Sequence, residues 1–230
     1  MSAQQMPAPP ATATSAMITT LGVVATVCGL IIVSAYQGTY DAVAANKRIA
    51  IERAVFKVIP SAKSVSEFNA LPAGGIAPAG QGEPPAGAVK FYAAYDGTGK
   101  LAGVAAEGVA KGYADTVRIM FGYSPDCQCV VGMGVVSMRE TPGIGDKILT
   151  DREFLANFVS LDVQLNRELS ALANEVKAVK HGNKTKPWQI DAISGATITS
   201  RAVGKAINDS AQQLLPRLAP HIDKIGSKPS

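Results

Sequence analysis

The chain has 230 residues, of which 47% are hydrophobic and 17% charged, and its formal net charge is +4. This composition excludes a disordered chain and fits one globular domain together with one apolar segment. Lys and Arg are scattered, and no basic run is interleaved with aromatic residues, so we expect no nucleic-acid partner.

The N-terminal part predicts a polar tail and a membrane anchor. Residues 1–16 are rich in Pro, Ala, Thr and Gln, and we expect them to be disordered. Residues 17–36 carry no charge, and as a helix they span about 30 Å, which matches the hydrocarbon core. A signal peptide cleaved after Ala35 is the alternative, but no Lys or Arg precedes the apolar run, and the run is long for a signal. We therefore predict a single-pass transmembrane helix in the lipid bilayer.

The charges alone favour a cytoplasmic main domain. The first basic residues, Lys47, Arg48, Arg53 and Lys57, come after the apolar run. The positive-inside rule therefore places the main domain in the cytoplasm. The rule is weak for long translocated domains, and no charge on the short N-terminal side opposes the reverse orientation.

Beyond the anchor, the chain divides by composition into three parts. We expect a stalk helix ended by Pro60 and a Gly/Pro-rich loop within residues 37–88, a main domain over 89–220, and a tail over 221–230. Strand signals of apolar, β-branched and aromatic residues predict two strand pairs in the main domain, 89–95 with 101–106 and 116–123 with 129–136.

Three helices are predicted in the main domain, over 151–161, 168–177 and 201–215. Thr150 or Asp151 opens the first. An apolar stripe at helical spacing defines the last, namely Val203, Ala206, Ile207, Ala211, Leu214 and Leu215. The sequence therefore predicts an α+β domain, an antiparallel sheet with helices on one face.

The cysteines and several missing motifs narrow the chemistry. A disulfide between Cys127 and Cys129 demands awkward geometry, so we expect these residues and Cys28 to be buried or edge thiols. With two His residues in the chain, no zinc or iron–sulfur spacing is present. Dinucleotide fingerprints, Walker loops and hydrolase motifs are absent too, so we expect no catalytic residue, no Rossmann-type NAD site and no metal.

Two segments carry a chemical signal. The first is Asp191-Ala-Ile-Ser-Gly-Ala-Thr197, continued by Ile198-Thr199-Ser200 at the start of the last helix. Ser and Thr there are typical N-caps, and the free amides of a helix start attract phosphate. The second is Glu140-Thr-Pro-Gly-Ile-Gly-Asp-Lys-Ile148, a Pro-Gly turn after a strand, in which Gly145 lets the backbone pass close to something bulky. Each segment also has a purely structural interpretation, a capped helix start for the first and a plain tight loop for the second.

Together these segments resemble the FMN-binding domain family. The first matches its flavinylation motif, Asp-x-x-Ser/Thr-Gly-Ala-Thr, and the second its Glu-Thr-Pro-Gly-Leu-Gly loop with Ile144 for Leu; family members often carry His at the position of Met138. The resemblance covers roughly residues 112–213. It implies that a flavin transferase, using FAD, joins FMN through a phosphoester to the hydroxyl oxygen of Thr197.

The resemblance also suggests roles for neighbouring residues. Ser194 and the amides of Gly195 and Ala196 are expected to hold the phosphate. Asp191 is expected to orient this loop or to bind a cation during flavin transfer, a simple turn or N-cap carboxylate being the alternative. Candidate contacts to the flavin ring or ribityl chain are Glu140, Thr141 and Gly143.

Within the family, the chain is most similar to the G subunit of the Rnf complex, a membrane-bound, ion-translocating ferredoxin:NAD oxidoreductase. This implies an electron carrier that is not catalytic alone, in contact with the other membrane subunits. It also implies a bacterial inner-membrane protein with its FMN domain on the periplasmic side. The alternatives are the C subunit of a sodium-translocating NADH:quinone oxidoreductase and a non-redox, membrane-tethered interaction domain.

Overall fold

The computed structural model describes residues 14–80 and 84–228. Most of the N-terminal tail that we expect to be disordered, residues 1–13, lies outside the described residues. Residues Thr14 to Ala16 are already helical, because α1 runs from Thr14 to Val58. The chain forms two compact units, which divide between Ala50 and Ile51.

The first unit contains the segment that we expect to anchor the chain. Among the described residues, α1 is the one helix long and apolar enough to cross a membrane. Its large apolar side chains up to Ile49 are exposed, as a lipid-facing helix requires. The predicted anchor and stalk are thus parts of one continuous helix, which ends two residues before Pro60.

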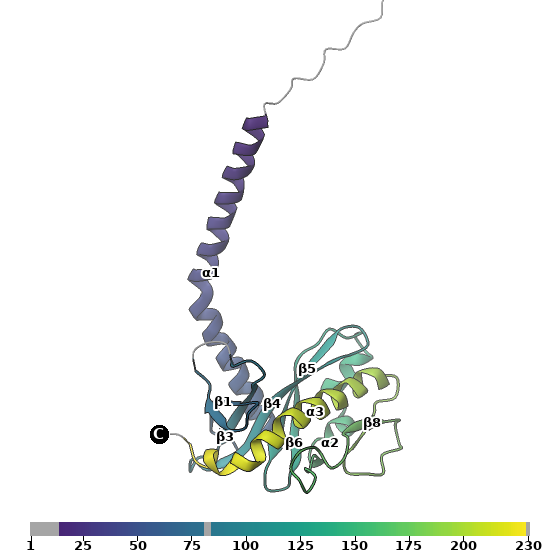
Figure 1. Cartoon of the computed structure of the whole chain (residues 1–230). Coiled ribbons are helices and arrows are strands. Elements are labelled where there is room, and N and C mark those ends of the chain that lie inside the picture. The colour runs from purple at the N-terminus through teal and green to yellow at the C-terminus, as the bar shows by residue number, and fades with distance from the viewer. Residues whose placement is uncertain (1–13, 81–83, 229–230) are drawn as a thin grey trace, which may run out of the picture. The chain divides into compact units, whose positions relative to one another are not determined.

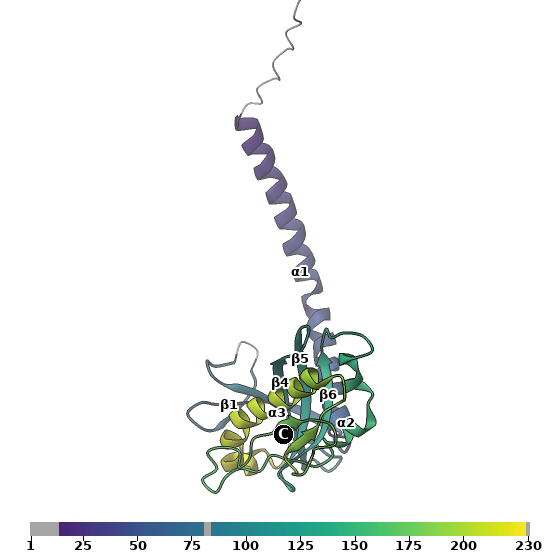
Figure 2. The ribbon, with the colours of Figure 1, turned by 90° about the vertical axis from the view of Figure 1, so that its right-hand side faces the viewer.

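A seven-stranded antiparallel sheet forms the centre of the second unit, in the order β2-β1-β3-β4-β5-β6-β7. Both predicted strand pairs are confirmed, whereas β1 was not predicted and β2 lies in the expected loop. Figure 2 shows β1 toward one side of the sheet and β6 with α2 toward the other. The strands are β1 Ser64–Ala70, β2 Ile76–Pro78, β3 Val89–Tyr95, β4 Leu101–Lys111, β5 Thr116–Ser124, β6 Cys129–Ser137 and β7 Leu161–Asp162.

Helices pack on both faces of this sheet. Helix α3 (Thr197–Leu218) covers one face and crosses in front of β4 in Figure 1. The last turns of α1, from Ile51 to Val58, pack on the other. Each helix lies so close to the sheet that a strand residue beneath it must be glycine. A Cβ at Gly108 would collide with the backbone carbonyl of Ala206 in α3, and a Cβ at Gly132 would collide with the backbone carbonyl of Val58 in α1. The α+β prediction is confirmed, but the expectation of helices on one face was wrong.

The remaining elements lie outside the seven-stranded sheet. Asp151 caps α2 as predicted, its carboxylate accepting from the amide of Phe154 at 2.9 Å, but the helix is shorter than expected. These elements are the 3₁₀ helix η1 Gly145–Leu149, α2 Arg152–Ala156, the parallel pair β8 Lys177–Val179 and β9 Gln189–Asp191, and the 3₁₀ helix η2 Ala219–Ile225.

The helix predicted over 168–177 is absent, so this prediction was wrong. The amide of Leu172 donates to the side-chain oxygen of Gln212 at 3.0 Å, and the amide of Val176 to that of Asn208 at 3.0 Å. Both acceptors lie on α3. This segment therefore satisfies two of its amides on a neighbouring element instead of on a helix of its own.

The prediction of free thiols at Cys127 and Cys129 was also wrong, because the two residues form a disulfide. Cys127 lies in the turn before β6 and not on the strand itself. The residue between them, Gln128, has a φ of 51°, and this left-handed turn brings the two Cα atoms to 5.2 Å. Cys28 is free and exposed on α1.

Candidate functional site

The segment from Asp191 to Ser200 forms a strand end, a tight turn and a helix start. β9 ends at Asp191, Gly195 has a φ of 83°, and α3 begins at Thr197. The hydroxyl of Ser200 accepts from the amide of Ile193 at 3.1 Å and donates to the carbonyl of Ala196 at 2.9 Å. The side chain of Ser200 therefore closes the turn that presents Thr197.

The start of α3 has no side-chain cap. Its N-cap residue is Ala196, so the expectation of a Ser or Thr cap was wrong. The amide of Ala196, which we expected to hold phosphate, donates to the carbonyl of Ile193 at 3.1 Å. The amides of Thr197, Ile198 and Thr199 have no hydrogen-bond partner among the described residues. These donors and the helix dipole favour an anion at this point.

The two sequence motifs meet at a hollow of about 550 Å³ in front of this helix start. Its volume lies within the range of small-molecule sites, about 300–1,000 Å³. Thr197 is half-buried at its edge. The lining residues are Tyr113, Glu140, Thr141, Ile144, Gly145, Gly195, Ala196, Thr197, Ile198 and Thr199.

Glu140 links three walls of this hollow. Its Oε1 accepts from the amides of Ala114 and Asp115 at 3.2 and 3.4 Å, and its Oε2 accepts from the hydroxyl of Thr199 at 2.9 Å. A Cβ at Gly145 would lie 2.7 Å from the Cβ of Glu140. The bulky neighbour that Gly145 accommodates is therefore Glu140 itself.

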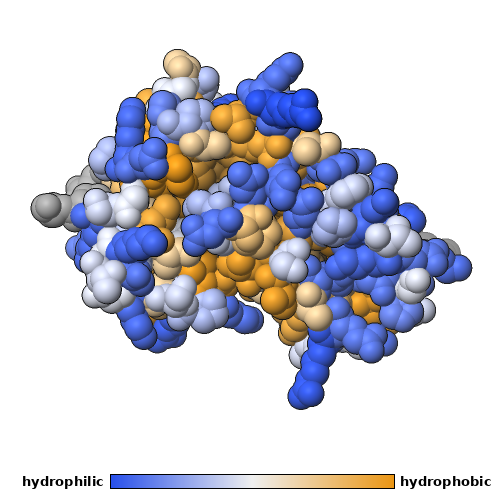
Figure 3. Space-filling view, turned by 90° about the horizontal axis from the view of Figure 1, so that it is seen from below, coloured by the Kyte–Doolittle hydropathy of each residue, from blue (hydrophilic) through white to orange (hydrophobic). Residues whose placement is uncertain are grey.

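Three exposed apolar side chains surround the hollow, and none was predicted. Tyr113 is 67% exposed, Ile144 50% and Ile198 49%. Figure 3 shows hydrophobic residues in a band between polar margins on one face of the molecule, so apolar exposure alone does not mark a site. Around this hollow, the exposed apolar side chains add surface for a flat aromatic group beside a helix start that favours an anion.

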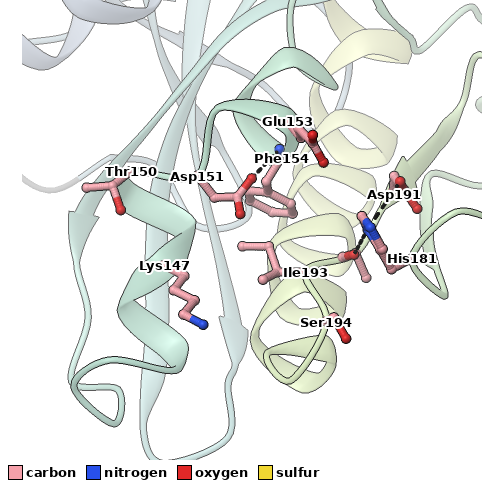
Figure 4. Close-up of a pocket in the computed structure, with 10 residues that line it drawn as sticks. Lys147, Thr150, Asp151, Glu153, Phe154, His181, Asp191, Ile193 and Ser194 are labelled. Atoms are coloured by element: carbon pink, nitrogen blue, oxygen red, sulfur yellow. Dashed lines mark hydrogen bonds and ion pairs between the residues drawn. The ribbon is translucent and has the colours of Figure 1, made fainter.

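Asp191 and Ser194 line a second hollow, of about 420 Å³ (Figure 4). The Asp191 carboxylate accepts from the amide of Gly182 at 2.8 Å and lies 3.5 Å from Nδ1 of His181. Asp191 thus anchors the loop after β8. This contact fits the alternative role given for Asp191 in the sequence analysis, that of a simple turn carboxylate. The structure does not bring these two side chains into the hollow that contains Thr197.

A buried asparagine that the sequence analysis missed holds β9 in place. The side-chain oxygen of Asn157 accepts from the amide of Asp191 at 3.0 Å, and its side-chain nitrogen donates to the carbonyl of Asp191 at 3.3 Å. Asn157 is 5% exposed. An isolated Asn after a short helix carries no sequence signal for such a long-range contact.

Gly143 and Met138 do not line the hollow that contains Thr197. Gly143, with a φ of 76°, lies in the exposed turn before Gly145 and does not line the hollow. Met138 packs against the main core. Among the described residues, no group of three or more His, Cys, Asp or Glu side chains is arranged to hold a metal ion.

Residues 112–212 match the model of the FMN-binding domain, so this part of the chain is similar to that family. The predicted family resemblance is confirmed. Both motifs lie inside the matched range, as do the start of α3 and the loop between β4 and β5 that carries Tyr113, here called the Tyr113 loop.

More particularly, the chain is similar to the G subunits of ion-translocating oxidoreductase complexes. It is 32% identical to that subunit of Methanosarcina acetivorans, over 53% of this chain and 56% of the relative. It is 28% identical to the G subunit of the proton-translocating ferredoxin:NAD(+) oxidoreductase complex of Clostridium ljungdahlii, over 82% and 84%. Identity to the Aliivibrio fischeri subunit is 36%, over 47% and 48%. The match thus spans about half the length of two of these relatives.

Solved structures share the fold. NqrC of Shewanella oneidensis superposes with a TM-score of 0.57, covering 79% of this chain and 98% of that one, at 19% identity. The C subunit of the Na(+)-translocating NADH-quinone reductase of Parabacteroides distasonis gives 0.54, covering 78% and 94%, at 17% identity. At these identities, the likeness establishes the fold.

Proposed function

We propose that the chain is a membrane-anchored electron-transfer subunit of an Rnf-type complex, with FMN joined covalently to Thr197. The observation that carries this proposal is the meeting of two motifs, far apart in the sequence, at one hollow beside the Thr197 hydroxyl. The similarity to the G subunits of ion-translocating complexes supports the choice of complex. When bound, FMN supplies the redox chemistry.

The chain's own residues fit each part of such a group. The amides of Thr197, Ile198 and Thr199, for which the described part of the chain supplies no acceptor, suit the phosphate. In the attachment step, the Thr197 hydroxyl oxygen would form a bond to the FMN phosphorus of FAD. The bond from that phosphorus to the bridging oxygen would break, AMP would leave, and the hydroxyl proton would be released. The side chains of Tyr113 and Ile198 offer apolar surface to the ring. Because attachment is through the phosphate, the ring edge stays available to an electron donor or acceptor.

The remaining contacts are proposed from the positions of the residues. Thr141 lines the hollow, and we propose that its hydroxyl contacts the ribityl chain. Gly143 acts indirectly, by turning the loop that carries Ile144. The Glu140 carboxylate already accepts hydrogen bonds from the Thr199 hydroxyl and two backbone amides. Its role toward the flavin is therefore to hold together the segments that line the hollow. Asp191 and Ser194 present the motif to the flavin transferase from the second hollow.

Covalent attachment is tested by expressing the full-length chain with and without a flavin transferase. We expect an intact mass increased by one FMN, less one water, only with the transferase. Yellow fluorescence should then stay with the protein band in a denaturing gel. A flavin that is lost on denaturation, or an unmodified mass in the presence of active transferase, would contradict the proposal.

We further propose that α1 anchors the chain in the bacterial inner membrane and that the second unit faces the periplasm. The disulfide between Cys127 and Cys129 supports this side, because disulfides persist in oxidising compartments. The partners would be the other membrane subunits of the complex and, during maturation, the flavin transferase.

Protease added to intact spheroplasts is therefore expected to digest the second unit. A domain protected until the inner membrane is broken would place it in the cytoplasm instead. N-terminal sequencing of the mature protein is the control for the anchor, since a chain that begins after Ala35 would have lost it.

The likeness to the C subunits of sodium-translocating NADH:quinone oxidoreductases favours that complex as the second candidate. Purification from native membranes in mild detergent separates the two. Copurification with Rnf-type membrane proteins supports the first proposal, and copurification with the other subunits of a quinone reductase supports the second.

A further inference from the structure

The disulfide of the β5–β6 turn joins two sulfur atoms in different environments. Cys127 is exposed, whereas Cys129 is 6% exposed at the start of β6. Gln128 between them is exposed as well. An attacking thiolate can therefore reach the sulfur of Cys127, while that of Cys129 is shielded.

Two features of this turn make its disulfide easy to reduce. The closed loop is very short, and a disulfide that closes a short loop removes little entropy from the unfolded chain. Gln128 is held at a φ of 51°, a left-handed conformation that is unfavourable for residues other than glycine. Opening the disulfide releases this residue. Exposed disulfides in strained surroundings are the labile ones in proteins.

We propose that Cys127 and Cys129 form a reversible thiol–disulfide exchange site whose substrate is a dithiol reductant. A thiolate of the reductant attacks Sγ of Cys127, the bond between the two cysteines breaks, and Cys129 leaves as a thiolate that takes a proton from solvent. The second thiolate of the reductant then attacks the mixed disulfide and releases Cys127. Two electrons pass to the cysteine pair, and the reductant becomes a disulfide. This chemistry is independent of the flavin.

The redox state of this site is coupled to the edge of the sheet. The carbonyl of Gln128 accepts from the amide of Val163 at 3.2 Å, and Cys129 pairs with Asp162 of β7. Strand β7 has only two residues, so it depends on these contacts. When the disulfide opens, Gln128 leaves its left-handed conformation and the Val163 amide loses protection from hydrogen exchange.

The full-length protein with Cys28→Ser tests the proposal, because every label then reports on the pair. The protein is held without denaturant at graded ratios of reduced to oxidised dithiothreitol, quenched in acid and alkylated with a polyethylene glycol maleimide. We expect one step from unlabelled to doubly labelled protein, with faster exchange at Val163. Protein that is labelled before any reductant is added, or that resists reduction until it is unfolded, would overturn the proposal.

Two matched cysteine variants test the direction of attack. In Cys129→Ser, the exposed Cys127 should form a mixed disulfide with oxidised glutathione at least about tenfold faster than the buried Cys129 does in Cys127→Ser. Equal rates in two folded variants would refute Cys127 as the attacked sulfur. Thermal unfolding of both variants verifies that each is folded.

Two variants of Gln128 test the role of the backbone. Asn tolerates the left-handed conformation, so Gln128→Asn should require about a fivefold more reducing dithiol ratio for half-reduction, whereas the β-branched Gln128→Val should shift the midpoint the other way. Midpoints that are unchanged in both variants would refute the strain contribution and leave exposure as the only cause of lability.

Discussion

Thr197→Val is expected to abolish covalent FMN while the fold survives. Valine keeps the shape of threonine but lacks the hydroxyl oxygen that a phosphoester requires. Thr197 is half-buried at the start of α3, and the turn before it does not depend on its side chain, because the hydroxyl of Ser200 closes that turn. Intact-mass spectrometry of the variant, expressed with a flavin transferase, decides the outcome.

Thr199→Val is the matched control, two residues further along the same helix. Its hydroxyl is buried and donates to Glu140, so removing it should lower the free energy of unfolding by about 2 kcal/mol. The FMN adduct should nevertheless form, because Thr197 is unchanged. An adduct that persists on Thr197→Val, or one that disappears only from a folded Thr199→Val, would overturn the assignment of the attachment site.

Glu140→Ala should have the second largest effect, because one carboxylate joins the Tyr113 loop, the loop before η1 and the start of α3. Its loss removes three hydrogen bonds and leaves the buried Thr199 hydroxyl without its acceptor. We expect the free energy of unfolding to fall by about 3 kcal/mol and flavin loading to fall with it. Chemical denaturation measures the first effect and intact mass the second.

Glu140→Gln is the control, since its amide oxygen can still accept from the amides of Ala114 and Asp115. It should retain most of the flavin loading. The double variant Glu140→Ala with Thr199→Val should lose less stability than the sum of the two single variants, because both remove the same hydrogen bond. Additive losses would contradict the direct contact between the two side chains.

The parts of the fold that the sequence predicted are those with strong local signals. The hairpin of β3 and β4 has apolar runs on either side of Asp96-Gly-Thr-Gly-Lys100, and α3 has an apolar stripe. β1 lacks such a pattern and is held by pairing with β3. The helix that we expected near Leu172 fails because α3 supplies distant acceptors for its amides.

In the candidate site too, the features that the sequence predicted are those carried by a local motif. The resemblance of both motifs to one family predicted that Thr197 and the Glu140 loop belong together, and the hollow is lined by both. The orientation of Asp191 toward Gly182, and the use of Glu140 as a link between walls, depend on contacts with segments that carry no motif. The disulfide required a left-handed Gln128, which no residue preference indicates.

The hydrogen bonds of Ser200 bear on the order of events during biogenesis. The turn before Thr197 is closed by the chain itself, through Ile193, Ala196 and a serine already inside α3. The turn that presents Thr197 therefore requires the first turn of the helix as well as the motif. If Thr197 is the attachment point, we expect α3 to fold before modification, and a short peptide that ends before Ser200 to be a poor acceptor.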